Sequence, residues 1–368
     1  MGINELATPA VLVDRNILQS NIAAMASRAR ELGCRLRPHV KTHKCPDIAR
    51  LQLQAGASGI TVSTMAEARA MVAAGIADIL YAVPVAPDRV PEAIALHQQG
   101  HSIHLLVDGA PAGEAVSGRA AAIGVLIPVW LKVDCGAGRA GVDPEDPESM
   151  ALALHLAGLP GVRLAGVLTH AGQAYGCSSR AEIAAAARRE RDVTVAFGRR
   201  LRAAGLPGVE VSIGSTPTLT AVDHLAGVDE VRPGNYVYFD ATQVALGSCS
   251  WSECALTVLA TVIGCYPRRR RLLLDAGALA LSKDPGPRHL DPGCGFGRIL
   301  DPGYRLLALT QEHATVEVPP GDDPTAFPVG TRLRVVPNHS CLAAACFDHV
   351  NLVEGDQVVA RWPTVRGW

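Results

Sequence analysis

Short apolar segments alternate with amphipathic segments over the first part of the chain. The apolar runs predict strands at about 35–40, 59–63, 78–83, 102–107, 125–134, 162–170, 209–214 and 229–239. Most of the intervals between them have the periodicity of helices. Eight strands alternating with helices are typical of an α/β fold with a parallel (β/α)8 barrel, and a doubly wound open sheet is the alternative. A count of eight strands favours closure of the sheet, so we expect a TIM-like barrel over residues 15–247.

Helix start and stop signals support this alternation. An amphipathic helix is expected near residues 15–32. Thr64 and Ser179 each precede a glutamate by three positions, which is the spacing of a capping box. Gly75 and Gly205 stand where the two capped helices should end.

The pattern changes after about residue 248, where helical periodicity nearly disappears. Strands are predicted at 256–263, 272–274, 304–309, 314–318, 333–336 and 357–362. We therefore expect a C-terminal all-β domain over residues 248–368, to which an N-terminal strand within residues 1–14 returns. The Gly/Pro-rich stretch 284–303 is predicted to be a long functional loop. The basic run 268–271 lies between two predicted strands and indicates a solvated hairpin turn.

Composition excludes several function classes. The chain of 368 residues has 34 Lys and Arg against 35 Asp and Glu, so it lacks the basic excess of an electrostatic nucleic-acid binder. No apolar run is long enough to predict a membrane span, and no export signal is visible. The ten cysteines then indicate thiols of a cytoplasmic protein, with a metal ligand among them, better than a disulfide framework.

The chemistry of such a barrel belongs at the carboxyl ends of its strands. The first strand ends in the cation-rich stretch 37–44, which contains His39 and Lys41. A lysine at this position is a candidate desolvated nucleophile, and the alternative is that it is a solvated loop residue. Further strand ends carry Asp134 and the 136–139 segment, His170 with Tyr175, Ser215 with Thr216, and the segment 232–236.

A phosphate-binding cradle is predicted opposite this lysine. Gly-Ser-Thr at 214–216 precedes a helix start and can present N–H groups and hydroxyls, although the same residues also make an ordinary turn. Gly234, Asn235 and Tyr236 would supply its second half. A lysine for a Schiff base together with a phosphate cradle indicates a pyridoxal 5'-phosphate site. Arg139 is a candidate partner of the pyridine nitrogen, and a surface salt bridge is the alternative.

His339 and Cys341 form a candidate metal site. Two residues apart, they would share one face of a strand, and imidazole plus thiolate suits Zn²⁺. Two protein ligands leave positions for water and substrate, as in a catalytic site, whereas the alternative is a buried thiol beside a hydrogen-bonded histidine. The role of His313 in Gln-Glu-His 311–313 stays open. Other histidines are taken as structural: His43, His97, His101, His104, His155, His224 and His349.

Together these residues resemble the fold type III pyridoxal phosphate enzymes, and within them the D-serine dehydratase and D-threonine aldolase family. The resemblance runs over nearly the whole chain. It depends on the segments 37–44, 56–64, 138–142, 168–172, 214–218, 232–240, 311–313 and 337–341. The Cys-Gly-Ala-Gly segment 135–138 and the proline-rich loop 284–293 depart from the family pattern and bear on substrate choice.

The resemblance implies a role for each candidate residue. Lys41 would be the Schiff-base lysine and Arg139 would face the pyridine nitrogen. His339 and Cys341 would bind a divalent metal. The remaining cofactor-binding residues would be His39, His170, Tyr175, Ser215, Thr216, Gly234, Asn235 and Tyr236, with His170 and Tyr175 also catalytic. A homodimer with shared active sites is implied as well.

The expected function is that of a lyase acting on a D-configured β-hydroxy amino acid. Aldolases of this family usually carry aspartate at the second metal position, so Cys341 favours the dehydratase branch, including D-serine and D-3-hydroxyaspartate dehydratases. The thiolate favours zinc. Retro-aldol cleavage to glycine and an aldehyde is the main alternative. An amino-acid racemase and a non-catalytic cofactor carrier are further alternatives.

Overall fold

The computed structural model describes residues 1–368, which form two compact units. The barrel unit comprises Ala24–Lys41, Ile48–Gly234 and Val365–Trp368. The sheet unit comprises Met1–Ala23, Thr42–Asp47 and Asn235–Thr364. Each unit is described by itself below.

The barrel unit contains eight parallel strands, as the sequence predicts. Their order is β2 (Arg35–Leu36), β9 (Glu230–Val231), β8 (Glu210–Ile213), β7 (Val162–Leu168), β6 (Ile127–Lys132), β5 (Ser102–Val107), β4 (Asp78–Pro84) and β3 (Ile60–Val62). A parallel bridge between His39 and Thr61 joins the two ends of this order. The Thr61 N–H donates to the Pro38 carbonyl at 2.9 Å, so the sheet closes as the predicted barrel.

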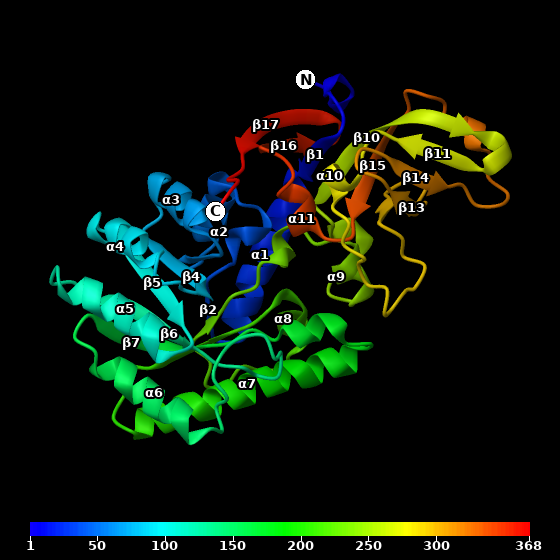
Figure 1. Ribbon diagram of the computed structural model, residues 1–368. Helices are drawn as coiled ribbons and strands as arrows, with labels where there is room; N and C mark the ends of the chain where they lie inside the picture. The colour runs from blue at the N-terminus through cyan, green and yellow to red at the C-terminus, as the bar shows by residue number, and fades with distance from the viewer. The chain divides into compact units, whose positions relative to one another are not determined.

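Helices alternate with these strands along the chain. They are α1 (Arg15–Glu31), α2 (Pro46–Gln54), α3 (Met65–Ala73), α4 (Val90–Gln98), α5 (Ala110–Ala121), α6 (Pro147–Gly158), α7 (Arg180–Ala203) and α8 (Thr216–Ala221). Figure 1 shows α4 to α7 on the outer side of strands β4 to β7. Both predicted caps form, because Thr64 accepts from the Glu67 N–H and Ser179 from the Glu182 N–H. Gly75 and Gly205 end these helices with positive φ, where glycine is favoured.

The interior of the barrel is filled by large apolar side chains. Trp130 is fully buried and packs with Leu80, Leu106 and Leu168. Its ring passes close to the backbone of β7, where a Cβ on Gly166 would lie 2.5 Å from Trp130 Cζ3. The indole N–H donates to His104 Nδ1 at 3.1 Å, which satisfies its one polar atom.

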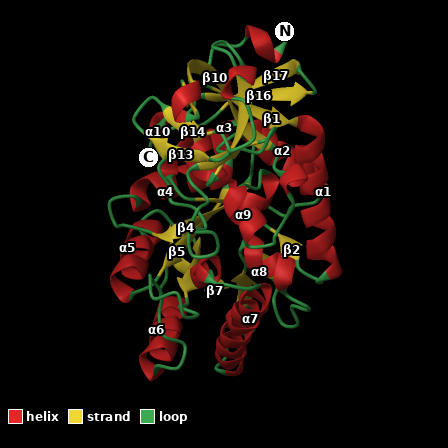
Figure 2. Ribbon diagram, turned by 90° about the vertical axis from the view of Figure 1, so that its right-hand side faces the viewer, coloured by secondary structure: helices red, strands yellow, loops and turns green.

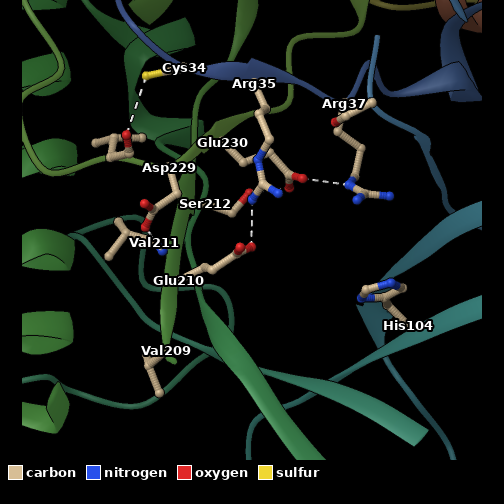
Figure 3. Close-up of polar contacts among 12 residues, drawn as sticks. Cys34, Arg35, Arg37, His104, Val209, Glu210, Val211, Ser212, Asp229 and Glu230 are labelled. Atoms are coloured by element: carbon tan, nitrogen blue, oxygen red, sulfur yellow. Dashed lines mark hydrogen bonds and ion pairs between the residues drawn. The ribbon is translucent and has the colours of Figure 1, made fainter. Parts of the chain in front are cut away.

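A network of buried ion pairs stabilises the closed barrel (Figure 3). Arg37, directly after β2, donates from Nε to Glu230 at 2.6 Å and from Nη1 to Asp78 at 2.6 Å. Ser212 donates to the second oxygen of Glu230 at 2.7 Å and accepts from Arg232 at 3.0 Å. Burial opposes the charge on Arg37, but the two carboxylates outweigh it and raise the pKa of the guanidinium. The network thereby ties β2 to β9 and to β4.

The sheet unit is organised around one nine-stranded sheet. Its main path is β13 (Leu306–Leu309), β14 (Ala314–Glu317), β11 (Arg271–Leu274), β10 (Leu256–Tyr266), β1 (Ala10–Asp14), β16 (His349–Glu354) and β17 (Gln357–Pro363). β15 (Arg332–Pro337) pairs with β10 and with β12 (Gly297–Ile299). The N-terminal strand returns to this sheet as predicted, antiparallel to β10 and parallel to β16. Figure 2 shows β1, β10, β16 and β17 grouped in this sheet.

Several sequence predictions differ from the structure in extent. β9 ends at Val231, so the segment 232–236 lies outside the strand, where Pro233 lacks an N–H for pairing. The sequence missed β12, which lies inside the predicted loop 284–303, and it missed β16. The C-terminal region also contains short helices, namely α9 (Ala241–Ala245), α10 (Ala278–Leu281) and α11 (Ser340–Ala344). None of the helices has the length and apolar character that crossing a membrane requires.

Candidate active site

Lys41 lies in a short 3-10 helix, Val40–Thr42, that begins soon after β2 ends. Its backbone N–H donates to His39 Nδ1 at 3.4 Å, and His39 Nε2 lies 3.4 Å from Ser63 Oγ. These contacts fix the His39 ring beside the lysine backbone. The Lys41 side chain is exposed.

The barrel unit also contains a buried amine, that of Lys132. It is the last residue of β6 and is only 6% exposed. Burial, with Arg232 and Arg139 nearby, lowers the pKa of its amine to about 8. Sequence reasoning missed this residue. The available signal was a lysine ending the otherwise uncharged segment 127–132, at the barrel edge where the chemistry was expected.

His170 follows β7 and lies among these cations. Burial lowers the pKa of its imidazole well below the usual value, and four cations add to that effect: Lys41, Lys132, Arg232 and Arg139. The imidazole is therefore neutral near pH 7 and able to accept a proton. Of the residues predicted from the sequence, the structure thus brings His170, Lys41 and Arg139 into one electrostatic neighbourhood.

Arg139 is exposed and belongs to a loop organised by Asp134. The Asp134 carboxylate accepts from the backbone N–H groups of Gly136 at 2.9 Å and of Ala137 at 2.8 Å. It also accepts from the N–H of Gly138 at 3.0 Å, and Gly138 has a positive φ of 64°. The predicted strand-end carboxylate therefore shapes the loop that presents the arginine.

Tyr175 lies in the 3-10 helix Gly172–Gly176 on the loop after β7 and is partly buried. Glu190 ties this loop to the next one. Its Oε1 accepts from the Ala171 N–H at 2.8 Å and from the Gly214 N–H at 3.1 Å. A buried carboxylate from α7 thus holds together the starts of two predicted cofactor-binding loops.

The predicted phosphate cradle begins at the N-terminus of α8. Ser215 is the N-cap residue, and both Ser215 and Thr216 are buried. Gly214 precedes them with φ of 108°, a conformation that favours glycine. Gly234 ends the barrel unit, whereas Asn235 and Tyr236 begin the sheet unit in the 3-10 helix Asn235–Val237.

His339 and Cys341 do not lie on a strand, which corrects the sequence prediction. β15 ends at Pro337, His339 is the N-cap residue of α11, and Cys341 lies in the first turn of that helix. The Cys341 sulfur nevertheless lies close enough to His339 to raise the pKa of the imidazole. A helix start brings them together as the expected strand geometry would have done.

A carboxylate from the predicted functional loop holds the imidazole of this pair. His339 Nδ1 lies 3.0 Å from Asp284 Oδ2. Burial opposes protonation of His339, but the neighbouring Cys341 sulfur and Asp284 outweigh it and raise the pKa of His339 to about 11. Asp284 is a second residue that the sequence alone did not identify, since nothing in its local pattern points to His339.

The thiol of the pair also has partners. Cys341 Sγ lies 3.2 Å from Thr42 Oγ1 and accepts from Asn235 Nδ2 at 3.7 Å. Burial acts in the opposite direction, but the charge of His339 and the hydrogen bond to Thr42 lower the pKa of the thiol. Thiolate and imidazole are donors that zinc prefers, so the pair fits a divalent metal ion such as Zn²⁺.

Asp240 fixes the helix that carries the thiol. Its Oδ2 accepts from the Ser340 N–H at 2.9 Å and from Asn235 Nδ2 at 2.7 Å. Its Oδ1 accepts from the Gln243 N–H at 3.0 Å, which caps α9. One buried carboxylate therefore anchors the N-termini of α9 and α11.

The remaining predicted features are placed as follows. The loop that starts at Asp284 lines a cavity of about 320 Å³, together with α9 and Asn338. His313 is exposed on the turn between β13 and β14, with Nδ1 3.5 Å from Thr310 Oγ1. On the barrel side, four cations near a neutral imidazole and a glycine-led helix start match an anionic cofactor, so these residues fit pyridoxal phosphate.

Comparison with known proteins identifies both parts of the chain. Residues 13–242 match the family model "Alanine racemase, N-terminal domain", and residues 255–353 match "Putative serine dehydratase domain". A D-threo-3-hydroxyaspartate dehydratase of Delftia sp. (strain HT23) is 42% identical, covering 99% of this chain and 98% of its own length. A D-serine dehydratase of Dictyostelium discoideum is 34% identical, covering 100% and 98%.

A solved structure is similar over the same extent. It is that of a D-threo-3-hydroxyaspartate dehydratase mutant in the metal-free form, with a TM-score of 0.94 and 40% identity. The match covers 100% of both chains. The similarity therefore includes both units and is not confined to the barrel.

Proposed function

We propose that this chain, which belongs to the D-serine dehydratase and D-threonine aldolase family of fold type III pyridoxal phosphate enzymes, eliminates water from a D-configured β-hydroxy amino acid. The substrate loses its β-hydroxyl, and the resulting enamine hydrolyses to a 2-oxo acid and ammonia. D-serine would give pyruvate, and D-3-hydroxyaspartate would give oxaloacetate. Similarity to the dehydratases of Delftia and Dictyostelium supports the proposal of these two substrates.

Each predicted site residue has a task in this reaction. Lys41 would hold the cofactor and, once released, take the α-proton on its amine. Arg139 would donate to the pyridine nitrogen, and the neutral His170 could accept or return a proton. Others would orient the cofactor: His39, Tyr175, Ser215, Thr216, Gly234, Asn235 and Tyr236. Pyridoxal phosphate, when bound, withdraws electrons from the α-carbon.

The His339–Cys341 pair is the observation that carries the proposal. An arginine at the pyridine nitrogen leaves that nitrogen unprotonated, which makes the cofactor a weaker electron sink. Loss of hydroxide then needs a second electrophile. A divalent metal, when bound, neutralises charge on the departing oxygen. The metal-free description of the related mutant structure supports metal binding, and a sulfur ligand favours zinc among the common divalent ions.

Thr42 links this pair to the lysine through the chain itself. It contacts Cys341 Sγ at 3.2 Å and directly follows Lys41 in the sequence. A peptide bond therefore connects the proposed proton acceptor to a partner of the proposed metal ligand.

A panel of D-serine, D-threonine and D-3-hydroxyaspartate, with every product identified, tests this function. We expect 2-oxo acids and ammonia in equal amounts, and loss of both on treatment with a chelator. L-serine is the matched control and should not react. Glycine and an aldehyde, without 2-oxo acid, would instead establish the retro-aldol alternative, in which the Cα–Cβ bond breaks.

Three further expectations from the sequence stay predictions. They are a homodimer with shared active sites, a cytoplasmic location, and a domain boundary between residues 247 and 248. Size-exclusion chromatography with light scattering tests the first. A mixture of Lys41→Ala and His339→Ala chains tests site sharing, because mixed dimers would regain one intact site.

A further inference from the structure

The loop that begins at Asp284 makes the closest polar contact to the imidazole of the proposed metal ligand. Asp284 Oδ2 lies 3.0 Å from His339 Nδ1, and its Oδ1 accepts from the Gly286 N–H at 2.8 Å. Both carboxylate oxygens are therefore engaged, one with the histidine and one with its own loop. The carboxylate is held in place and does not depend on His339 alone for its orientation.

This contact has a direct consequence for metal binding. A carboxylate that accepts from Nδ1–H fixes the tautomer in which Nε2 carries the free lone pair. It also fixes the ring orientation and raises the basicity of the ligating nitrogen. With Asp284 on Nδ1, only Nε2 of His339 is available to a metal ion.

The loop reaches this position by packing closely on Asn338. The Asn338 amide donates to the carbonyls of Asp284 at 3.1 Å and of Gly295 at 2.9 Å. Gly286 has φ of 64°, and a Cβ there would lie 2.5 Å from Asn338 Nδ2. The loop can therefore deliver Asp284 only while position 286 is glycine.

We propose that Asp284 is the positioning residue of the metal site and holds His339 in its metal-binding tautomer and orientation. Gly286 allows the loop 284–303 to place Asp284 beside His339. The proposal depends on the proposed function, since it assumes that His339 and Cys341 bind a divalent metal. Asp284 acts through His339, with which it makes its contact.

The test measures metal affinity directly. Purified Asp284→Ala, Asp284→Asn and wild-type enzyme are titrated with Zn²⁺ against a competing chelator of known affinity. We expect Asp284→Ala to weaken binding about 10- to 100-fold, as loss of such partners typically does. Asp284→Asn keeps one oxygen that can accept from Nδ1–H but loses the second acceptor, which holds the Gly286 N–H, so it should recover only part of the loss.

A spectroscopic readout separates positioning from general damage. Co²⁺-loaded enzyme reports ligand geometry through its visible absorption bands. We expect these bands to shift in Asp284→Ala and to shift less in Asp284→Asn. Unchanged affinity and unchanged bands in Asp284→Ala would overturn the proposal.

Two matched controls distinguish this contact from other effects of the loop. Asp291 lies on the same loop but pairs with Arg305 at 2.9 Å, so Asp291→Ala should retain wild-type metal affinity. Gly286→Ala changes no polar side chain, yet it should lower metal affinity as Asp284→Ala does. Gly321→Ala also places a side chain at a positive φ, here 101°, but its Cβ would meet no atom within 4 Å, and metal affinity should not change.

Failure of this proposal and failure of the proposed function give different results. If wild type and Asp284→Ala bind Zn²⁺ equally while 2-oxo acid is produced, only the role of Asp284 is wrong. If wild type and His339→Ala also bind equally, the metal site itself is wrong, and this proposal is overturned with it. Tight metal binding without 2-oxo acid production would refute only the proposed dehydratase activity.

Discussion

His170 in the barrel unit and His339 in the sheet unit have opposite surroundings. His170 lies near four cations, and its pKa is lowered well below the usual value. His339 lies against a thiol and a carboxylate, which raise its pKa to about 11. Both residues are partly buried, and burial alone would lower both pKa values. The sign of the neighbouring charges makes the difference.

The comparison shows how one chain divides two tasks. A histidine among cations is neutral and can exchange a proton, whereas a histidine between a thiolate and a carboxylate attracts positive charge. A metal ion can take the place of the proton on such a pair. The cationic region suits an anionic cofactor, and the thiolate–imidazole pair suits a metal.

Removal of the lysine amine should have the largest effect on the cationic side. Lys41→Ala is expected to lower turnover by about 10³-fold or more, since it removes both the cofactor attachment and a proton acceptor. The visible absorbance of the protein-linked cofactor should disappear as well. Lys44→Ala, three positions away, is the control and should retain both. Turnover within tenfold of wild type in Lys41→Ala would contradict this role.

Removal of the imidazole should affect the other side selectively. His339→Ala is expected to keep the cofactor absorbance and to lose bound metal, measured by elemental analysis. Turnover should fall by about 10³-fold, as loss of several kcal/mol of electrophilic stabilisation implies. Equal loss of the cofactor in His339→Ala and Lys41→Ala would break the division between the two regions.

Substitutions in the ion network of Figure 3 test how strongly the stability of the barrel depends on buried charge. Arg37→Met leaves Glu230 buried without its cation and should lower the free energy of unfolding by about 3–5 kcal/mol. Arg35→Met removes the exposed pair with Glu210 and should cost less than about 1 kcal/mol. Thermal unfolding of both variants measures the difference. Equal melting temperatures would show that the buried network is not a major stabilising contact.

The smallest expected effect is a shift in the titration of His170. Because its folded pKa lies below the unfolded value, the folded state binds fewer protons, and stability should fall as pH drops below about 6.5. Lys41→Ala removes one of the cations, so the pKa of His170 should rise. NMR titration of the imidazole protons measures this rise. A pKa unchanged by the substitution would remove Lys41 from the surroundings of His170.

Local pattern was sufficient for the barrel. Eight apolar runs, two capping boxes and the glycines after them predicted strands, helices and closure, because each signal acts within a few residues. The strand at the N-terminus was also predicted to return to the second domain, and β1 does pair with β10 and β16.

Local pattern was insufficient for the metal pair. His-x-Cys was expected on a strand, but Asp240, a hundred positions earlier, accepts from the Ser340 N–H and fixes a helix start there. Asp284 reaches His339 across 55 positions from a loop that is rich in glycine and proline. Such partners are invisible in a single sequence, because their identity depends on which loops meet in space.

The sequence by itself determined which chemical groups this protein has and the strand ends that carry many of them: the lysine, the histidines and the thiol. Only the tertiary structure decided their charge. Lys132 is a buried amine with a pKa of about 8, while Lys41 is exposed, and two histidines titrate in opposite directions. Protonation depends on burial and on charges a few ångströms away, and those distances exist only after folding.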